Sequence, residues 1–164
     1  MCVLITTTNT DIIKMEIKTQ IERKFIVRGL PDLTDFKKEE IQQWYTTKPG
    51  EDESIRIRKY SDDRCYVDII HGQGKIRKKY GRKSNWDKFK DKDLSHLPTI
   101  RKTRYKKQYD NVLMCVDIFE DGLQLVEIES YDSEFSIDRF VIPEWFGKEV
   151  TEEIEYTNNW LAYL

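Results

Sequence analysis

Residues 20–25 read QIERKF, and far downstream residues 125–129 read LVEIE, so polar or charged side chains alternate with others in both stretches. Between them, residues 55–58 read IRIR and residues 102–105 read KTRY. Successive side chains of a β-strand point to opposite faces, so each stretch directs two or three polar groups the same way. Several such strands side by side predict a concave surface with both signs of charge, which suits a polyphosphate bound with its metal ion.

The same alternation also has a simpler explanation, because charged residues on a strand usually mark its solvent-exposed face. Pairs of Glu and Arg across exposed neighbouring strands stabilise a sheet by only about 0.2–1 kcal/mol each. A sheet that closes on itself has an interior as well as an exterior, and four such strands in one small domain favour the interior placement. Spacing alone leaves both interpretations open.

Composition narrows the class of protein. The 164 residues are enough for one domain with a single core. Apolar residues make up 38% and charged residues 35%, and the mean hydropathy of −0.71 excludes an integral membrane protein.

The net charge of −2 gives no bulk attraction for nucleic acid, although basic residues cluster at 75–92 and 101–107. The widely spaced Cys2, Cys65 and Cys115 suit a reducing cytoplasm, with Cys65 and Cys115 buried.

The first residues lack the basic and apolar segments of a signal peptide. We expect residues 1–14 to form a disordered leader and residues 15–164 to form the domain. Met15 stands just before the first predicted strand, so either Met1 or Met15 serves as the native start.

Segments rich in Ile, Val, Tyr and Phe predict a mainly β protein with flanking helices, of the α+β class. About eight strands in one small domain predict an antiparallel sheet that curls toward a barrel. Short helices are expected from Thr34 to Glu40, over 85–94 behind a Ser84 cap, and around Trp160. The strands are predicted at 20–28, 41–47, 53–60, 65–71, 74–81, 99–108, 112–119 and 123–130.

The charged residues of these strands fit one kind of chemistry. A triphosphate carries several negative charges, so binding it requires several Arg and Lys groups, with Arg preferred for bidentate contacts. Mg²⁺ and Mn²⁺ prefer hard oxygen ligands, so carboxylates must converge among those cations before the ion bridges phosphate oxygens. The cation candidates are Arg56, Arg58, Arg77, Lys102 and Arg104, and the metal-ligand candidates are Glu22, Glu127 and Glu129.

The ordered set of motifs from Met15 onward resembles the triphosphate tunnel metalloenzyme superfamily, also called CYTH domains. Residues 20–25 resemble its ExExK signature, residues 55–58 its paired-arginine strand, and residues 100–105 its KxRY-like strand. Residues 125–129 resemble the strand that ends in ExE, and residues 142–151, IPEWFGKEVT, resemble the C-terminal signature. Members include inorganic triphosphatases, thiamine-triphosphatases, class IV adenylate cyclases and fungal-type RNA triphosphatases.

The resemblance implies an eight-stranded antiparallel tunnel with helices packed outside and with Mg²⁺ or Mn²⁺ as cofactor. It implies that Glu22, Glu127 and Glu129 hold the ion, with Gln20 as a weaker ligand. Together with Lys24, the three glutamates are the expected catalytic residues. The expected phosphate-binding residues are Lys24, Arg56, Arg58, Arg77, Lys79, Lys102 and Arg104.

The chain departs from the family pattern in ways that lower the negative charge of the tunnel. Gln20 replaces the first Glu of the signature, and Lys79 and Gly81 stand where the family usually has acidic residues. These changes should weaken a metal site and strengthen the binding of a metal-free anion. Asp68 and Asp117 would supply missing carboxylates if the strand register differs by one residue from the alignment.

We therefore expect a divalent-metal-dependent phosphohydrolase that acts on inorganic tripolyphosphate or on a nucleoside or organic triphosphate. The missing carboxylates support a second hypothesis, a non-catalytic tunnel that binds a nucleotide or polyphosphate. Adenylate cyclase-like activity ranks last because no adenine-specific feature is visible. The basic segment at 75–83 makes an RNA 5′ end a less favoured partner. No membrane partner is expected, and the protein is a monomer or a homodimer.

Overall fold

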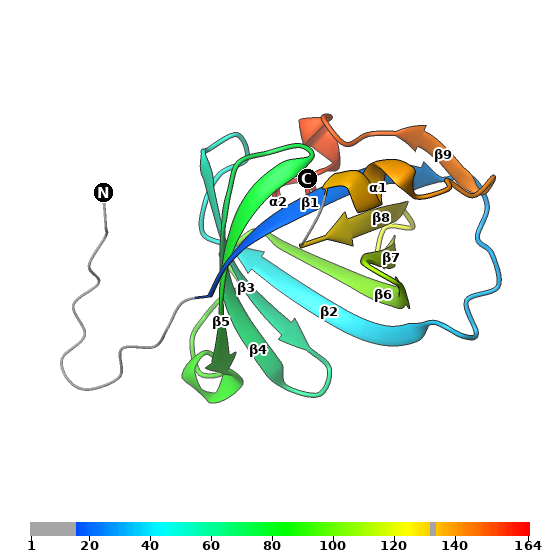
Figure 1. Cartoon of the computed structure of the whole chain (residues 1–164). Coiled ribbons are helices and arrows are strands. Elements are labelled where there is room, and N and C mark those ends of the chain that lie inside the picture. Colours follow the sequence, from blue (N-terminus) through cyan, green and yellow to red (C-terminus); the bar gives the residue numbers. More distant parts are fainter. Residues whose placement is uncertain (1–15, 132–133) are drawn as a thin grey trace.

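The computed structural model describes residues 16–131 and 134–164, and the expected leader at 1–14 lies outside them (Figure 1). Strands dominate, and the helices are short, so the expected α+β class is confirmed. The strands are β1 (Glu16–Val27), β2 (Lys37–Tyr45), β3 (Glu53–Tyr60), β4 (Arg64–His71), β5 (Ile76–Asn85), β6 (Thr99–Tyr109), β7 (Val112–Phe119), β8 (Gln124–Ser130) and β9 (Phe146–Glu149). The helices are α1 (Glu134–Arg139), α2 (Asn158–Ala162) and the 3₁₀ turns η1 (Trp86–Lys88) and η2 (Ile154–Tyr156).

The first eight strands close into a ring. Their order is β5-β4-β3-β2-β6-β7-β8-β1, and β5 also pairs with β1. Neighbouring strands pair antiparallel throughout the ring, as in the pairing of Gln20 with Arg77 between β1 and β5. The expected tunnel of eight antiparallel strands is therefore confirmed. No helix in the described residues is long and apolar enough to cross a membrane.

Two expected helices are wrong in their local detail. The segment after Thr34 turns only briefly, and β2 begins at Lys37 because residues 37–40 pair with β6. The segment over 85–94 contains only η1, which Asn85 caps in place of Ser84. The expected C-terminal helix is present as α2, whereas α1 and β9 were not predicted from the sequence.

The outer face of the ring carries two apolar clusters, and β1 contributes apolar side chains from odd positions to the first of them. In the first, Ile21 and Phe25 pack with residues of β7 and β8 beneath α1 and β9. In the second, Trp44 and Cys65 lie under the segment that contains Trp86. Trp44 and Trp86 stack with ring centroids 5.4 Å apart. Because these clusters take up the apolar side chains outside, the polar side chains of the same strands point into the tunnel.

Inward-facing side chains stack in layers along the tunnel, because the strands are inclined to its axis and their registers shift steadily around the ring. At one end, α2 packs against an apolar layer of Tyr45, Ile100, Phe119 and Leu125. Two charged layers follow. The first contains Glu22, Arg56, Arg77, Lys102, Asp117 and Glu127, and the second contains Gln20, Arg58, Asp68, Lys79, Arg104 and Glu129.

Candidate functional site: a charged tunnel

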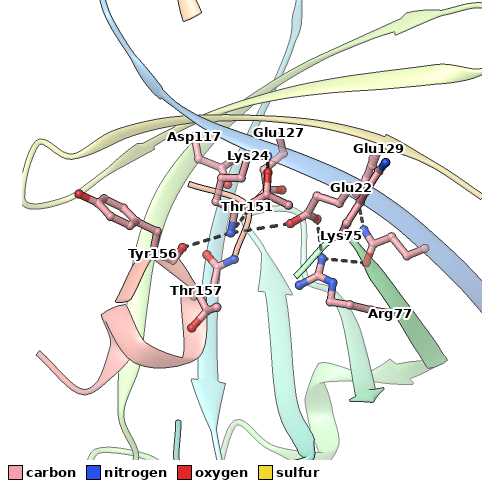
Figure 2. A network of polar contacts seen from close by, with 12 residues as sticks. Glu22, Lys24, Lys75, Arg77, Asp117, Glu127, Glu129, Thr151, Tyr156 and Thr157 are labelled. Carbon is pink, nitrogen blue, oxygen red and sulfur yellow. Dashed lines mark hydrogen bonds and ion pairs between the residues drawn. The ribbon is translucent and has the colours of Figure 1, made fainter. Parts of the chain in front are cut away.

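Three buried glutamates converge in the centre of the tunnel (Figure 2). Glu22 comes from β1, and Glu127 and Glu129 come from the neighbouring β8, where Glu22 lies opposite Glu129. One carboxylate oxygen from each lies within 4.8 Å of the others, and each residue is at most 6% exposed. Three like charges buried so closely repel one another and therefore require cations. The structure thus brings together the three predicted metal ligands.

Cations from neighbouring strands already contact these glutamates. Lys24 Nζ lies 3.2 Å from Glu127 and 3.8 Å from Glu22, while Arg104 donates to Glu127 at 3.0 Å. Arg77 donates to Glu22. The acid cluster is therefore neutralised by Lys and Arg side chains that an incoming ion would have to displace or outcompete.

The pKa values of Glu22 and Glu127 shift in opposite directions because their neighbours differ. Burial raises the pKa of Glu22 above its usual range, and the nearby Glu127 adds to this effect, while Arg77 opposes it. Burial also acts on Glu127, but Lys24 and Arg104 outweigh it and hold the pKa of that carboxyl well below its usual range. Glu127 is therefore ionised at neutral pH. A divalent ion bound to the cluster would also favour the ionised form of Glu22.

Gln20 uses its amide in an unexpected way. Its nitrogen donates to Glu129, and its oxygen accepts from Arg77 at 3.0 Å. The expected role of Gln20 as a weak metal ligand requires the oxygen to turn toward the glutamates and release Arg77. In the arrangement observed, Gln20 holds a carboxylate and a guanidinium together without adding charge of its own.

Arginines and lysines form the wall that faces the glutamates. Arg56 and Arg58, both on β3, are buried, with 7% and 8% exposed. Arg56 donates to Asp68 at 2.9 Å, whereas Arg58 donates to the neutral Gln43 at 2.8 Å. Because its Gln43 partner carries no charge, Arg58 keeps a positive charge available for an anion in the tunnel.

Lys79 and Lys102 add two lysines whose charge depends on pH. Burial lowers the pKa of Lys79 to about 8, and Arg58 and Arg56 contribute to the shift. Burial likewise lowers the pKa of Lys102 to about 8, although Asp117, at 2.6 Å, opposes it. Both lysines remain largely protonated at neutral pH and lose their charge only slightly above it.

Two aspartates enter the tunnel without any slip in register. Asp117 accepts from Lys102 and from Arg104, the latter at 2.7 Å for each of two nitrogens, and Asp68 accepts from Arg56. Asp68 also lies opposite Gly81, where an added Cβ would approach its Oδ1 to 3.0 Å. Asp68 thus occupies the space in front of Gly81, so a carboxylate is present there although position 81 has none.

The C-terminal segment, which packs at the apolar end of the tunnel, also accepts hydrogen bonds from two lysines of the charged interior. Lys24 Nζ donates to the Tyr156 carbonyl at 3.1 Å, and Lys102 Nζ donates to Asn158 at 2.9 Å. Figure 2 shows Tyr156 and Thr157 reaching the same side of the glutamate cluster as Lys24. Neither Gln43 nor Asn158 could be predicted as a tunnel residue, because neither belongs to a recognisable charge pattern.

Side chains of both charges line a polar cavity in the tunnel, among them Gln20, Glu22, Arg58, Lys79 and Tyr131. The donor set fits a small hard cation, since three carboxylates converge at a spacing that one ion can bridge. The facing wall of Arg and Lys fits a multiply charged phosphate. Carboxylates on one side and guanidinium groups on the other can hold a metal-bound polyphosphate between them.

Comparisons of sequence and of structure with known proteins lead to the same family. The family model of the CYTH domain matches residues 18–157. The chain is 33% identical over 150 residues to an inorganic triphosphatase of Nitrosomonas europaea, covering 88% of this chain and 97% of that protein. It is 30% identical over 145 residues to an inorganic triphosphatase of Acetivibrio thermocellus, covering 85% and 90%. A crystal structure of an inorganic triphosphatase aligns with a TM-score of 0.63 at 29% identity, covering 88% of this chain and 95% of that chain. This chain therefore belongs to the CYTH domain family.

Proposed function

We propose that this protein is a divalent-metal-dependent phosphohydrolase that acts on a triphosphate compound, either inorganic tripolyphosphate or a nucleoside or organic triphosphate. The observation that carries the proposal is the convergence of Glu22, Glu127 and Glu129 within 4.8 Å, opposite buried arginines in one tunnel. Two relatives named inorganic triphosphatase, at 33% and 30% identity, support the same class of reaction.

The three glutamates would hold Mg²⁺ or Mn²⁺, and Gln20 would add a neutral oxygen if its amide turned. When bound, such an ion neutralises phosphate charge and lowers the pKa of coordinated water. Arg56 and Arg58 bind phosphate oxygens from the opposite wall, and Arg104 binds them from beside Glu127. These arginines stabilise the negative charge that develops in the transition state. The expected reaction is direct attack by water on phosphorus, so no side chain needs to act as a nucleophile.

The decisive experiment measures phosphate release from tripolyphosphate, ATP and thiamine triphosphate by the purified protein with Mg²⁺, Mn²⁺ or EDTA. Release that requires the metal supports the proposal. An absence of release with either metal, from protein whose melting curve shows a folded state, argues against it. Formation of cyclic AMP from ATP would instead indicate cyclase-like activity.

A second candidate function is a non-catalytic receptor for polyphosphate or nucleotide. The observation that favours it is the occupation of the glutamates by internal partners, since Arg77 contacts Glu22 and the Gln20 amide contacts Glu129. Such a receptor would be stabilised by tripolyphosphate in EDTA, because a ligand that binds only the native state raises the melting temperature. Stabilisation that required metal would count against it.

Replacing Gln20 with glutamate is expected to tighten Mg²⁺ binding about tenfold, because the affinity of an oxygen-ligand site rises with its charge. The new carboxylate would lie beside Glu129, the present partner of the Gln20 amide. Calorimetric titration with Mg²⁺ measures the change. Gln42→Glu on the outer face of β2 is the matched control, and an equal affinity of wild type and Gln20→Glu would exclude a metal-ligand role for position 20.

Binding of metal-free tripolyphosphate is expected to take up protons above pH 8. Lys79 and Lys102 have pKa values of about 8 in the free protein, so both are mostly neutral at pH 9. An anion in the tunnel favours their charged form and raises the pKa, so protons are bound with the ligand and the affinity falls as pH rises. Calorimetry in buffers of different ionisation enthalpy measures the uptake, which Lys79→Met should reduce. Proton release would contradict the assignment.

The buried free thiols of Cys65 and Cys115 support a cytoplasmic location, since neither forms a disulfide. We also propose that residues 15–164 act as one CYTH domain, and the family match at 18–157 supports these limits.

A further inference from the structure

The turn between β4 and β5 lies beside Glu22, and the proposed mechanism gives it no role. It consists of residues 72–75, and two of them, Gly72 and Gly74, have positive φ angles of 88° and 74°. Glycine adopts such angles without strain, but it also leaves a chain more conformational freedom than other residues do. The turn therefore depends on contacts with other segments to keep one conformation.

The turn holds Glu22 through its backbone. The pairing between β1 and β5 ends where Ile21 lies opposite Ile76. Beyond that point, the Glu22 N–H donates to the Lys75 carbonyl at 2.8 Å. Figure 2 shows Lys75 on the same side of the glutamate cluster as Glu22 and Arg77. The conformation of the turn thus decides how firmly the backbone of Glu22 is held.

The same turn also leads directly into Arg77. The Arg77 Nη2 contacts both Gln20 and Glu22. Among the described residues, none accepts a hydrogen bond from its buried Nε. The guanidinium is therefore held by hydrogen bonds at one nitrogen, and its place against Glu22 depends on where the turn puts the start of β5.

Glu152 holds the turn from outside the tunnel. Its Oε1 accepts from the Lys75 N–H at 3.1 Å. Its carboxylate also lies against Gly74, where an added Cβ would approach Oε2 to 2.1 Å, so a residue with a side chain would displace it. The Lys75 side chain adds an ion pair with Asp138 of α1 at 2.7 Å, but an exposed pair of this kind stabilises little. The contact of Glu152 with the backbone is therefore the one that can fix the turn.

The segment that carries Glu152 is itself attached to β1. The Val150 N–H donates to the Lys24 carbonyl at 2.8 Å, and the Lys24 N–H donates to the Thr151 hydroxyl at 3.1 Å. Lys24 stands two residues after Glu22 on the same strand. Glu152 therefore connects the turn to a segment whose position is already fixed relative to Glu22.

Building on the proposed function, we propose that Glu152 is a positioning residue, which fixes residues 72–75 and thereby holds Glu22 and Arg77 in the geometry that binds the metal ion. Glu152 acts through the turn and contacts neither the ion nor the substrate. A single hydrogen bond of this kind shifts an equilibrium by roughly two- to tenfold. Its loss should therefore loosen the metal site without unfolding the protein.

The first test measures backbone amide hydrogen exchange by NMR in the metal-free, full-length protein. Glu152→Ala is expected to speed the exchange of the Glu22 N–H about fivefold, because opening of the turn frees that group from Lys75. Exchange in β7 and β8 should not change. Glu152→Gln keeps an acceptor oxygen and should retain most of the wild-type protection. The matched control is Glu144→Ala, which removes a carboxylate from an exposed position before β9 and should leave the Glu22 amide as it is.

The second test approaches the contact from the turn. The methyl group of Gly74→Ala would occupy the place of the Glu152 carboxylate and should break the same hydrogen bond. Glu152→Ala is then expected to add little further loss in the Gly74→Ala background. In each protein, calorimetric titration with Mn²⁺ measures the metal site directly, and Glu152→Ala alone should weaken Mn²⁺ binding about fivefold.

Three results would overturn the inference: unchanged exchange of the Glu22 amide in Glu152→Ala, an equal effect of Glu144→Ala, or fully additive losses in the double variant. Phosphate release from tripolyphosphate is measured in parallel. If exchange and Mn²⁺ affinity respond as expected but the wild type releases no phosphate, the positioning role stands and the hydrolase proposal fails. If the wild type hydrolyses tripolyphosphate but Glu152→Ala changes neither exchange nor Mn²⁺ affinity, the hydrolase proposal stands and the positioning role fails.

Discussion

Glu127→Gln is expected to lower metal-dependent phosphate release from tripolyphosphate by about three orders of magnitude. Glu127 is 4% exposed, contributes one oxygen to the glutamate cluster and contacts both Lys24 and Arg104. Its low pKa keeps it anionic at neutral pH, so the amide removes a full charge from the proposed metal site. The initial rate of phosphate release at saturating Mg²⁺ measures the effect.

The interpretation of this variant requires a control for folding, because Lys24 and Arg104 would face a neutral amide in a buried site. A thermal melt shows whether Glu127→Gln remains folded, and Mn²⁺ titration shows whether it still binds metal. Glu120→Gln, whose side chain is 71% exposed, makes the same chemical change outside the tunnel and should leave the rate unchanged. Near wild-type release from folded Glu127→Gln would remove the glutamate cluster from the mechanism.

Arg58→Ala is expected to raise the KM for tripolyphosphate about 100-fold, because charge-assisted hydrogen bonds contribute roughly 1.5–3 kcal/mol each. Arg58 donates to the neutral Gln43 and lines the central cavity, so its charge is available to the ligand. Arg58→Lys should recover only part of the loss, because lysine lacks the planar fork that binds two oxygens. Steady-state kinetics of the three proteins gives KM and kcat separately.

A matched control for Arg58 is Arg101→Ala on β6, whose side chain is 59% exposed on the outer face. It removes the same charge from the protein and should change KM little. If Arg58→Ala lowers kcat while KM stays constant, Arg58 acts only in the transition state, and the assignment to substrate binding is wrong.

Local alternation was sufficient to predict much of the interior. Gln20, Glu22 and Lys24 lie on one face of β1, and the structure places all three inside at no more than 6% exposed. Arg56 and Arg58 likewise share one face of β3 and lie inside, with 7% and 8% exposed. The alternation in the sequence predicts which face each side chain occupies, because a strand has only two faces and its apolar face must pack against the core. The helix expected after Thr34 is absent because pairing with a distant strand decided the conformation there, as in the pairing of Lys37 with Lys106.

The antiparallel strands, the side chains that share a strand face and the family to which their order points could all be predicted from the sequence. The contacts between polar residues that are distant in the sequence could not be predicted. It takes the closed ring to bring Asp68 in front of Gly81, to put the Gln20 amide on Glu129, and to set Asn158 of α2 on Lys102. Residues as far apart as 109 positions meet in these contacts. Periodicity decides which face of a strand a side chain occupies, whereas contacts between strands depend on register and ring closure, which many residues decide together.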